Sequence, residues 1–540
     1  MEPTFSSRLV AVAIITAPDQ AAIASAAAIL ARVGRAVHLV MFGRITTNPA
    51  GHISQQLRER HAAMTAKYIV PPERYSFERG SRYLLFDPAN FIWFVTDDKG
   101  KAIVDGLSQA QGLEAAAATL AHLVGANPQS IEITSYLEKF IHYLVKIGFL
   151  HQDEYKPAQL PNGVADRPQV LYIHLTNKCN LRCPYCYNQE HRTELIQIGK
   201  EPGSSKVSTE GRTDDFLRII DEAAQLGFFE VKLTGGEATL NKDFLLMAAH
   251  ARSKGMRVNL LTNGTLVTPE LAREIAAVVD SVSISVDSAN PEEHDAVRGR
   301  GTHAKAINAF SLLREAGAKF LHVNAVITPI NVDSAGKFLD YAFNTLKADR
   351  VTTAGTDIVV DDPKGRWGAG SFQLTQEQQY RFFEQSRDFY RNRATECPVN
   401  VSRSSIFRRQ CGAGNGVVSM DANGDIYPCQ TLHRPEFCCG NAFASGLGPI
   451  LKQSRVLREA KCALVDVLPQ CRECAVRYIC GGGCRSEAYS KEGDYLAWNK
   501  EMCQIFFATA VDKLWKLATV PVQDSEKVVA KDDGQQRHTN

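Results

Sequence analysis

Cysteine is missing from the first third of this chain. The 540 residues contain 14 cysteines, and the first of them is Cys179. From there the cysteines fall into two groups, one that begins at Cys179 and one that begins at Cys397. Clustered cysteines in a chain without a secretion signal bind metal more often than they form disulfides. The distribution therefore predicts two separate metal-bearing regions.

The sequence also lacks long apolar runs and an excess of charge of one sign. No apolar stretch is long enough for a transmembrane helix, and an acidic residue stands where a signal peptide carries positive charge. The net charge of +2 argues against a surface adapted to nucleic acid or membrane. With 44% hydrophobic and 22% charged residues, the composition is that of a soluble globular protein. We expect about two to four domains and a cytoplasmic location.

Strand-like and helix-like segments alternate between Val170 and Ala354. Helical stretches separate six apolar segments: VLYIHLT, FFEVKLT, MRVNLLT, SVSISVD, LHVNAVIT and RVTTAG. Such alternation is typical of βαβ units with a parallel sheet. Because only six units are present, the pattern predicts an α/β fold with a partial (β/α)6 barrel, not a closed eightfold barrel.

Three cysteines, Cys179, Cys183 and Cys186, follow the first of these strands at C-x3-C-x2-C spacing. Active sites of α/β folds lie at the carboxyl ends of strands. A structural zinc ion needs four ligands, and His174 or His191 is a candidate for the fourth. A [4Fe–4S] cluster held by three thiolates instead leaves one iron open to a small molecule. We favour the cluster, because the missing fourth cysteine then has a use.

The triplet resembles the signature of the radical S-adenosylmethionine (radical SAM) superfamily, C-x3-C-x-aromatic-C. The resemblance extends over the whole barrel region, including the Gly-Gly-Glu stretch after the second strand. It implies that a reduced cluster cleaves S-adenosylmethionine to give a 5′-deoxyadenosyl radical, which abstracts hydrogen from an unactivated C–H bond. The residues that it assigns to cofactor binding are Tyr185, Thr234, Gly235, Gly236, Glu237, Ser285 and Arg298.

Taken singly, these residues have ordinary explanations. A Gly-Gly-Glu stretch is otherwise a tight turn, and Ser285 or Arg298 is otherwise a cap or a surface charge. Asn263 and Asp287 end neighbouring strands without a firm assignment, and Val326 is explained as well by a core position as by an adenine contact. The position of the Gly-Gly-Glu stretch one βα unit after the cysteine triplet favours the functional interpretation.

A second cysteine pattern occupies the last quarter of the chain. It is similar to the SPASM extension of radical SAM enzymes, which holds two auxiliary [4Fe–4S] clusters, although its C-x2-C-x5-C-x3-C part alone fits zinc about as well. The resemblance implies one cluster on Cys471, Cys474, Cys480 and Cys503, and another on Cys411, Cys429 and Cys484. For the second of these, the fourth ligand is Cys397, Cys438 or Cys439, or the iron is open. The prediction is three [4Fe–4S] clusters in all.

A different pattern lies between Arg82 and Leu150. Two short strands, RYLLFD and FIWFV, are joined by a turn and followed by three helices, the last of which has an apolar stripe. This order predicts a winged-helix α+β domain and resembles a RiPP recognition element. Such domains capture the leader of a ribosomally made precursor peptide by β-augmentation. A purely structural domain is the alternative.

Together the resemblances imply an enzyme, a radical SAM oxidoreductase that modifies a precursor peptide bound through its leader. A one-electron donor such as flavodoxin or ferredoxin would reduce it, and the product would be a thioether or carbon–carbon cross-link. Peptide epimerisation, backbone excision and quinone-cofactor chemistry are alternatives. So are a non-peptide or protein substrate and a non-catalytic iron–sulfur carrier. Gln430 stands where anaerobic sulfatase-maturing relatives carry an aspartate base, which argues against that activity.

The expected organisation has seven parts. They are a small α/β segment without assigned role (1–75), the winged-helix domain (76–155), a linker (156–169), the radical SAM barrel (170–360), a bridging helical region (361–396), the SPASM domain (397–518) and a disordered tail (519–540).

Overall fold

The computed structural model describes residues 67–110, 112–152, 154–158, 169–188, 212–355, 372–393 and 406–518. The chain divides into two units, Met1–Ala66 and Lys67–Asn540, and the described residues all belong to the second. Residues 1–66 of the predicted small α/β segment and the predicted tail (519–540) lie outside them, as do His191 and Cys397. Among the described helices, none has both the length and the apolar character needed to cross a membrane.

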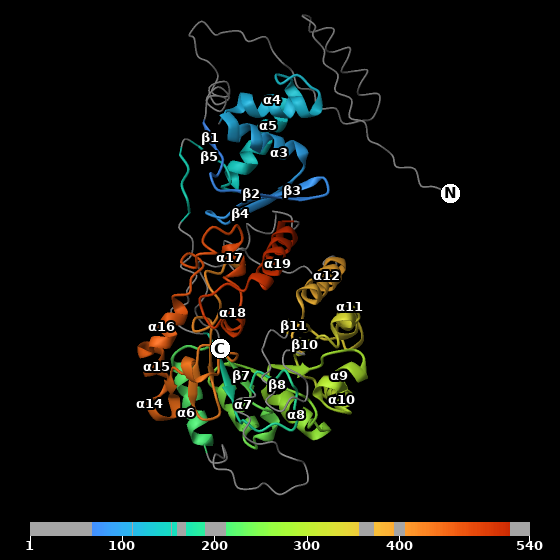
Figure 1. The fold of residues 1–540 in the computed structure, drawn as a ribbon, viewed down its shortest axis with the longest axis vertical. Helices are drawn as coiled ribbons and strands as arrows, with labels where there is room; N and C mark the ends of the chain where they lie inside the picture. The colour runs from blue at the N-terminus through green and yellow to red at the C-terminus, as the bar shows by residue number, and fades with distance from the viewer. Residues whose placement is uncertain are drawn as a thin grey trace, which may run out of the picture. The chain divides into compact units, whose positions relative to one another are not determined.

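A nine-stranded sheet forms the centre of this unit (Figure 1). Six strands run parallel in chain order: β6 (Val170–His174), β7 (Glu230–Thr234), β8 (Arg257–Thr262), β9 (Ser281–Ser285), β10 (Leu321–Ile327) and β11 (Arg350–Gly355). They coincide with the six predicted strands and confirm the predicted α/β partial barrel. Their carboxyl ends meet at one edge of the sheet, which places the residues that follow β6, β7 and β9 close together.

The sheet continues beyond β6, which the sequence did not predict. Strand β12 (Val417–Met420) pairs in parallel with β6, and β13 (Asp425–Tyr427) and β14 (Gly440–Asn441) follow in antiparallel pairing. Ser419 of β12 lies opposite Tyr172 of β6. Backbone hydrogen bonds therefore join the second cysteine region directly to the strand that precedes the cysteine triplet.

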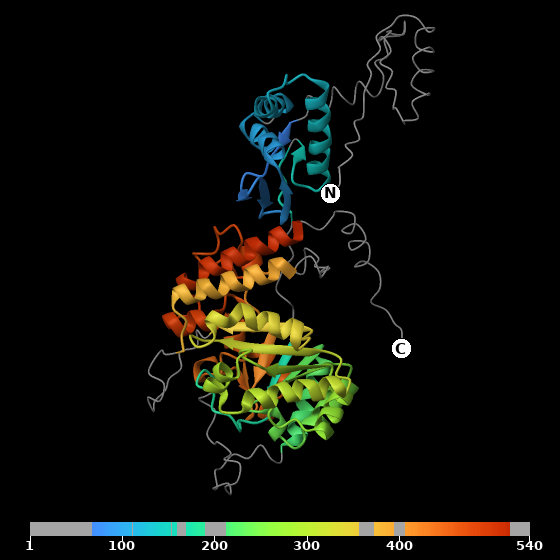
Figure 2. The ribbon, with the colours of Figure 1, turned by 90° about the vertical axis from the view of Figure 1, so that its right-hand side faces the viewer.

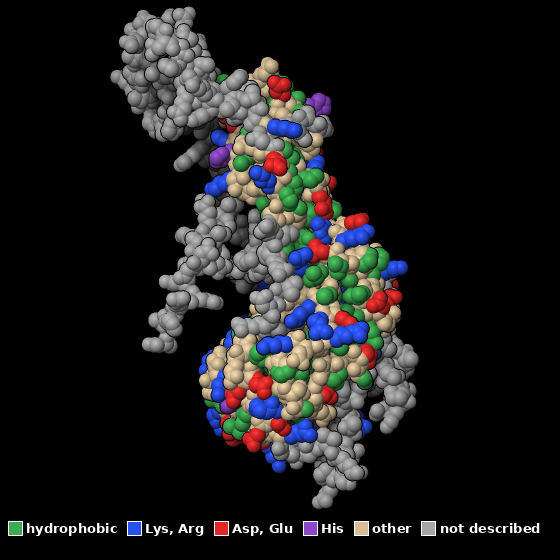
Figure 3. All heavy atoms as spheres, turned by 90° about the vertical axis from the view of Figure 1, so that its left-hand side faces the viewer, with side chains coloured by type: hydrophobic (Ala, Val, Ile, Leu, Met, Phe, Trp, Pro, Cys, Tyr) green, Lys and Arg blue, Asp and Glu red, His purple; other side chains and the backbone are tan. Residues whose placement is uncertain are grey.

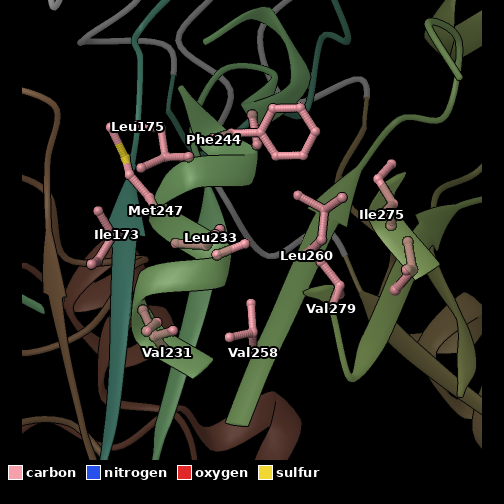
Figure 4. Close-up of a cluster of buried hydrophobic side chains, with 14 of the residues drawn as sticks. Ile173, Leu175, Val231, Leu233, Phe244, Met247, Val258, Leu260, Ile275 and Val279 are labelled. Atoms are coloured by element: carbon pink, nitrogen blue, oxygen red, sulfur yellow. The ribbon is translucent and has the colours of Figure 1, made fainter. Parts of the chain in front are cut away.

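Helices cover the outward face of the parallel strands. In chain order they are α6 (Thr213–Gln225), α7 (Phe244–Ser253), α8 (Pro269–Val278), α9 (Pro291–Arg298), α10 (Thr302–Glu315) and α11 (Ala335–Asp340). Figure 4 shows apolar strand residues such as Val231, Leu233 and Leu260 packed beside Phe244 and Met247 of α7. Because side chains alternate along a strand, every second residue points to the inward face of the barrel.

The inward face of the barrel is polar. Lys232 of β7 donates to the Tyr172 hydroxyl at 3.3 Å. On the other side of the barrel, Ser283 and His322 are joined at 3.0 Å, and His322 and Thr352 at 2.8 Å. Apolar residues between these positions, such as Val231 and Leu233, belong to the outward core. Side-chain alternation thus gives the sheet one face for packing and one for polar contacts.

The amino-terminal part of the unit is a small α+β arrangement. Its elements are β1 (Tyr68–Ile69), β2 (Tyr75–Arg79), β3 (Arg82–Asp87), β4 (Ile92–Thr96), α3 (Asp98–Ala110), α4 (Leu113–Val124), α5 (Ile131–Lys146) and β5 (His151–Gln152). Strands β2, β3 and β4 form an antiparallel sheet, and β1 pairs with β5. Strands β3 and β4 and the three helices match predicted elements, whereas β2 is additional.

One face of this small sheet packs on the second cysteine region. Leu84, Phe86 and Trp93 share a buried cluster with Leu514 and Trp515 of α19 (Lys500–Ala518). Leu84 lies opposite Val95, and Phe86 lies opposite Trp93, so alternate residues of neighbouring strands form this face. The sheet is therefore attached to the cysteine-rich part by a hydrophobic core and not by the linker alone.

The remaining helices surround the second cysteine region. They are α12 (Gln376–Arg393), α14 (Ala442–Ser445), α15 (Leu447–Gln453), α16 (Arg455–Lys461), α17 (Arg477–Cys480) and α18 (Arg485–Glu492), together with α19. Helices α12 and α19 are in contact and run side by side in Figure 2. On the face drawn in Figure 3, Lys and Arg side chains are interspersed with Asp and Glu side chains, as the small net charge suggests.

Candidate functional site

The cysteine triplet lies in the loop that leaves β6. Cys179 and Cys183 are buried and Cys186 is half-buried, and the backbone NH of Leu181 points at the sulfur of Cys179 at 3.4 Å. Burial raises the pKa of Cys179 to about 12, and the nearby Glu237, Cys183 and Cys186 add to it. Three thiolates in such a place need positive charge beside them, as an iron–sulfur cluster provides. The donor set therefore fits the predicted cluster.

The Gly-Gly-Glu stretch after β7 lies directly against this loop. The NH of Gly236 donates to Thr176 O at 2.7 Å, and the NH of Glu237 donates to Lys178 O at 2.9 Å. A Cβ atom at Gly236 would stand 2.2 Å from Lys178 O, and one at Gly235 would stand 2.6 Å from Thr176 O. The close approach of two backbones is thus the physical reason for the glycines.

Glu237 is buried and oriented by the next strand. Its carboxylate accepts from the Thr262 hydroxyl at 2.7 Å, from the backbone NH of Asn263 at 2.8 Å and from the Thr239 hydroxyl at 2.7 Å. Most of these bonds end on Oε1, so Oε2 keeps room to accept a further donor such as an ammonium group. Asn263, which the sequence left without a firm assignment, therefore helps to orient Glu237.

Asp287 is the centre of a buried polar network just beyond β9. Its carboxylate accepts from the Tyr185 hydroxyl, from Arg298 Nε at 2.6 Å, from Arg298 Nη2 at 2.9 Å and from the backbone NH of Val326 at 2.9 Å. Burial would raise the pKa of Asp287, but Arg298 outweighs it, and the pKa lies below its usual value. The carboxylate is therefore ionised and has four donors.

Arg298 and Ser285 were both predicted to contact the cofactor. Arg298 ends α9, a helix that starts at the Asn290 cap with Pro291 in its first turn. Its guanidinium spends two NH groups on Asp287, lies 5.5 Å from the Tyr185 ring centroid and keeps three NH groups for other partners. Ser285 is the half-buried last residue of β9.

His174, the zinc-ligand alternative, ends β6 and is fully buried among aromatic rings. Its ring centroid lies 5.9 Å from that of Tyr187 and 4.6 Å from that of His433. The His433 ring in turn stacks on Tyr427 at 4.4 Å, two residues before Cys429. These rings form a continuous packed row between the two cysteine regions.

The described residues contain no group of three or more His, Cys, Asp or Glu side chains that could hold a metal ion. A cluster is a different case, because its thiolates bind separate irons and need not converge on one point.

Five of the predicted auxiliary ligands line one cavity, and four of them belong to the same predicted cluster. Cys471, Cys474 and Cys480 come from the segment around α17, and Cys503 comes from α19. The same cavity is lined by Arg485 and by apolar side chains such as Trp498 and Phe506. Burial raises the pKa of Cys471 to about 11, and Arg485 opposes this effect. The four thiols of this set, on a largely apolar surface, fit a [4Fe–4S] cluster.

Cys411, Cys429 and Cys484 form a second set. Burial raises the pKa of Cys429, and Cys411 raises it further. Burial also raises the pKa of Cys484 well above its usual value, with additional effects from Glu487, Cys411 and Cys429. Cys411 and Cys429 thus both act on the Cys484 thiol, and Glu487 acts on it as well. Cys484 also lines the cavity of the first set.

Cys438 and Cys439 were candidates for the missing fourth ligand. Burial raises the pKa of Cys438, with Asp425 as a charged neighbour, and burial raises that of Cys439 to about 12, with Cys438 as a neighbour. The backbone NH of Cys439 donates to Ile426 O at 2.8 Å in the β13–β14 ladder. Every cysteine among the described residues is a free thiol.

Comparison with known families gives two matches. Residues 173–342 match the model of the radical SAM superfamily, and residues 411–475 match SPASM, an iron–sulfur cluster-binding domain. The first match contains the triplet, the Gly-Gly-Glu stretch and Asp287. The second contains two cysteines of each auxiliary set.

Several curated proteins are similar to the chain. Mycofactocin maturase MftC of Mycolicibacterium smegmatis is 30% identical over 60% of this chain and 80% of its own length. AdoMet-dependent heme synthase of Nitratidesulfovibrio vulgaris is 27% identical over 64% and 95%. PqqA peptide cyclase of Streptomyces rochei is 28% identical over 61% and 88%.

A solved structure of anSMEcpe with bound AdoMet has the same fold. It is 20% identical, its TM-score is 0.52, and the match covers 67% of this chain and 98% of that protein. At this level of identity the likeness concerns the fold alone.

Proposed function

The chain belongs to the radical SAM/SPASM family of enzymes, and we propose that it matures a ribosomally made precursor peptide by installing a thioether or carbon–carbon cross-link. Two observations support a peptide substrate. PqqA peptide cyclase is among the similar proteins. A small α+β arrangement with an antiparallel sheet precedes the barrel, where a leader-binding domain would be useful.

The observation that carries the proposed chemistry is the packing of Gly235 and Gly236 against the loop of the cysteine triplet. This contact brings Glu237 near Cys179 of the triplet, since Glu237 is among the charged neighbours of that thiol. A ligand of the open iron would therefore have a carboxylate and backbone carbonyl groups within reach. An amino group carried by that ligand is the natural partner for them.

When bound, the cluster at the triplet would supply one electron to S-adenosylmethionine, and the resulting 5′-deoxyadenosyl radical would take a hydrogen atom from the substrate; an auxiliary cluster would accept the second electron of the oxidation, and the second proton would pass to solvent. The residues of the chain bind and orient S-adenosylmethionine and shield it from water. Oε2 of Glu237 and the backbone after β7 accept from the ammonium, and the remaining NH groups of Arg298 donate to a carboxylate. Cys183, Tyr185 and Phe372 pack in one apolar cluster, which excludes water from the loop.

The proposal includes three [4Fe–4S] clusters. One would sit at the triplet, one on Cys471, Cys474, Cys480 and Cys503, and one on Cys411, Cys429 and Cys484. For the last, an iron without a cysteine ligand would be available to a substrate thiolate, which suits thioether formation. The proposal also includes a one-electron donor such as flavodoxin or ferredoxin. The cytoplasmic location stays a prediction from the sequence.

Anaerobic reconstitution tests the chemistry. The reduced protein should convert S-adenosylmethionine to methionine and 5′-deoxyadenosine, and a variant with Cys179, Cys183 and Cys186 changed to alanine should not. Co-expression with a candidate precursor peptide, sought among short reading frames beside the gene, should yield a peptide that has lost two hydrogens. An unchanged peptide mass would rule out an oxidative cross-link and leave epimerisation as an open alternative.

A non-peptide substrate is the second candidate, because AdoMet-dependent heme synthase is also similar over nearly its whole length. Removing the amino-terminal domain is a poor test, since its loss would expose Leu514 and Trp515. Truncating the precursor peptide is a better test than truncating the enzyme. A precursor without its leader should bind far more weakly than the full precursor, whereas equal binding would contradict leader guidance.

A further inference from the structure

The Asp287 network connects four separate segments of the chain. Tyr185 belongs to the cysteine loop, Asp287 follows β9, Arg298 ends α9, and Val326 lies in β10. The side chains of Asp287 and Arg298 are 0% and 9% exposed, and Tyr185 is 5% exposed. A buried carboxylate thus holds together the parts of the barrel that the proposed cofactor would touch.

The donor count shows what Asp287 can and cannot do. A carboxylate accepts about four hydrogen bonds, and Asp287 already receives four, two on each oxygen. It has no capacity left for a ligand. Arg298, by contrast, keeps three NH groups after pairing with Asp287. Within the network, Arg298 can therefore contact a ligand, and Asp287 can only orient other residues.

The backbone around Asp287 is fixed as well. Its carbonyl accepts from Asn331 Nδ2 at 2.7 Å, and the same Nδ2 donates to Val326 O at 3.0 Å. Its NH donates to His294 Nδ1 at 3.2 Å. Asp287 is therefore anchored to β10, to α9 and to the segment after β10, whereas Tyr185 is joined to it by a single hydroxyl.

We propose that Asp287 is a positioning residue that fixes the cysteine loop relative to Arg298 through the Tyr185 hydroxyl. The side chain of Tyr185 points from the loop, next to Cys186, toward the carboxylate, and the Arg298 guanidinium covers its ring at 5.5 Å. The aromatic position of the signature then has a second use here: its hydroxyl sets the distance between the triplet and Arg298. This inference rests on the proposed function, because it presumes a cluster at the triplet.

Tyr185→Phe is the sharpest test, because it removes only the oxygen that reaches Asp287. Anaerobically reconstituted protein should keep its iron and sulfide content, since all cysteines remain. Its affinity for S-adenosylmethionine should fall by about tenfold, the effect of losing one hydrogen bond to a charged group. The change that S-adenosylmethionine causes in the EPR signal of the reduced triplet cluster should be smaller or shifted.

A double-mutant cycle separates positioning from general damage. Asp287→Asn should weaken S-adenosylmethionine binding at least as much as Tyr185→Phe, and the double variant should be little worse than Asp287→Asn alone. Tyr341→Phe, on the helical outside of the barrel, is the matched control and should bind like the unchanged protein. Far-ultraviolet circular dichroism establishes that each variant is folded.

Three outcomes can be told apart. Unchanged affinity and an unchanged EPR response in Tyr185→Phe would overturn the inference, and so would additive effects in the cycle. If Asp287→Asn fails to fold, the comparison of Tyr185→Phe with Tyr341→Phe still tests the inference. If the unchanged protein holds no cluster or shows no response to S-adenosylmethionine, the proposed function fails, and that result is visible before any variant is made.

Discussion

Gly236→Ala tests the contact on which the candidate site depends. The new Cβ would stand 2.2 Å from Lys178 O and 2.5 Å from its carbonyl carbon, whereas contacts under 3.0 Å essentially never occur. Both atoms belong to the backbone, so no side chain can rotate away. The cysteine loop and the Gly-Gly-Glu stretch must move apart by roughly 1 Å.

The magnitude follows from what this movement breaks. The hydrogen bonds from Gly236 N to Thr176 O and from Glu237 N to Lys178 O are 2.7 and 2.9 Å long and run between the same two segments. Each contributes about 1 kcal/mol, and overpacking adds about 1–3 kcal/mol. We therefore expect the affinity for S-adenosylmethionine to fall by about 100-fold or more.

Equilibrium dialysis of anaerobically reconstituted protein measures this loss, with iron and sulfide content determined in parallel. Gly448→Ala is the matched control, because a Cβ there meets only Leu226 atoms, at 3.9 Å or more. Gly448 lies in α15, where alanine is the better helix former. Affinity within about twofold of the unchanged protein in Gly236→Ala would refute the reasoning, since 1.4 kcal/mol already corresponds to tenfold.

Three further changes test other parts of the molecule. Burial lowers the pKa of His294 to about 4, so as the pH falls the unfolded chain, with its value of 6.5, takes up the proton first. The contribution of this group to the free energy of unfolding is fully present above pH 6.5 and declines by about 3 kcal/mol as the pH falls toward 4. In urea unfolding, the free energy of unfolding of His294→Gln should therefore depend less on pH than that of the unchanged protein. Leu514→Ala removes a fully buried side chain between the amino-terminal sheet and α19 and should cost about 3 kcal/mol in calorimetry; a loss below about 1 kcal/mol would contradict the packing. Cys503→Ser should lower the bound iron by about four atoms per chain, while the EPR response to S-adenosylmethionine persists. Cys462 is exposed, so the control variant Cys462→Ser should lose no iron.

The local patterns in the sequence were sufficient for the barrel strands. All six parallel strands lie where apolar runs predicted them, because side-chain alternation and the residues between runs are local properties. The cysteine spacings predicted two metal-binding regions for the same reason, because spacing along the chain is also a local property. A three-residue spacing confines its ligands to one loop whatever the rest of the fold does.

The sequence could not predict the extension of the sheet through β12, β13 and β14. These strands are short, and β12 joins β6 across more than two hundred residues of chain. Strand β2 was missed because its residues, with alternating partial exposure, give no apolar run. Pairing partners of such strands are chosen by the sheet edge that is available and not by their own composition.

The role of Asp287 shows the same limit at the level of one residue. By itself it is an aspartate after a strand, and nothing in its neighbours along the chain distinguishes a cap from the centre of a network. Its partners come from a loop 102 residues before it and a strand 39 residues after it. The sequence determined the kinds of chemistry that the chain can support, because residue type and short spacing are local. Only the tertiary structure decided which charges meet, since a buried carboxylate is stabilised by donors that folding brings from elsewhere in the chain.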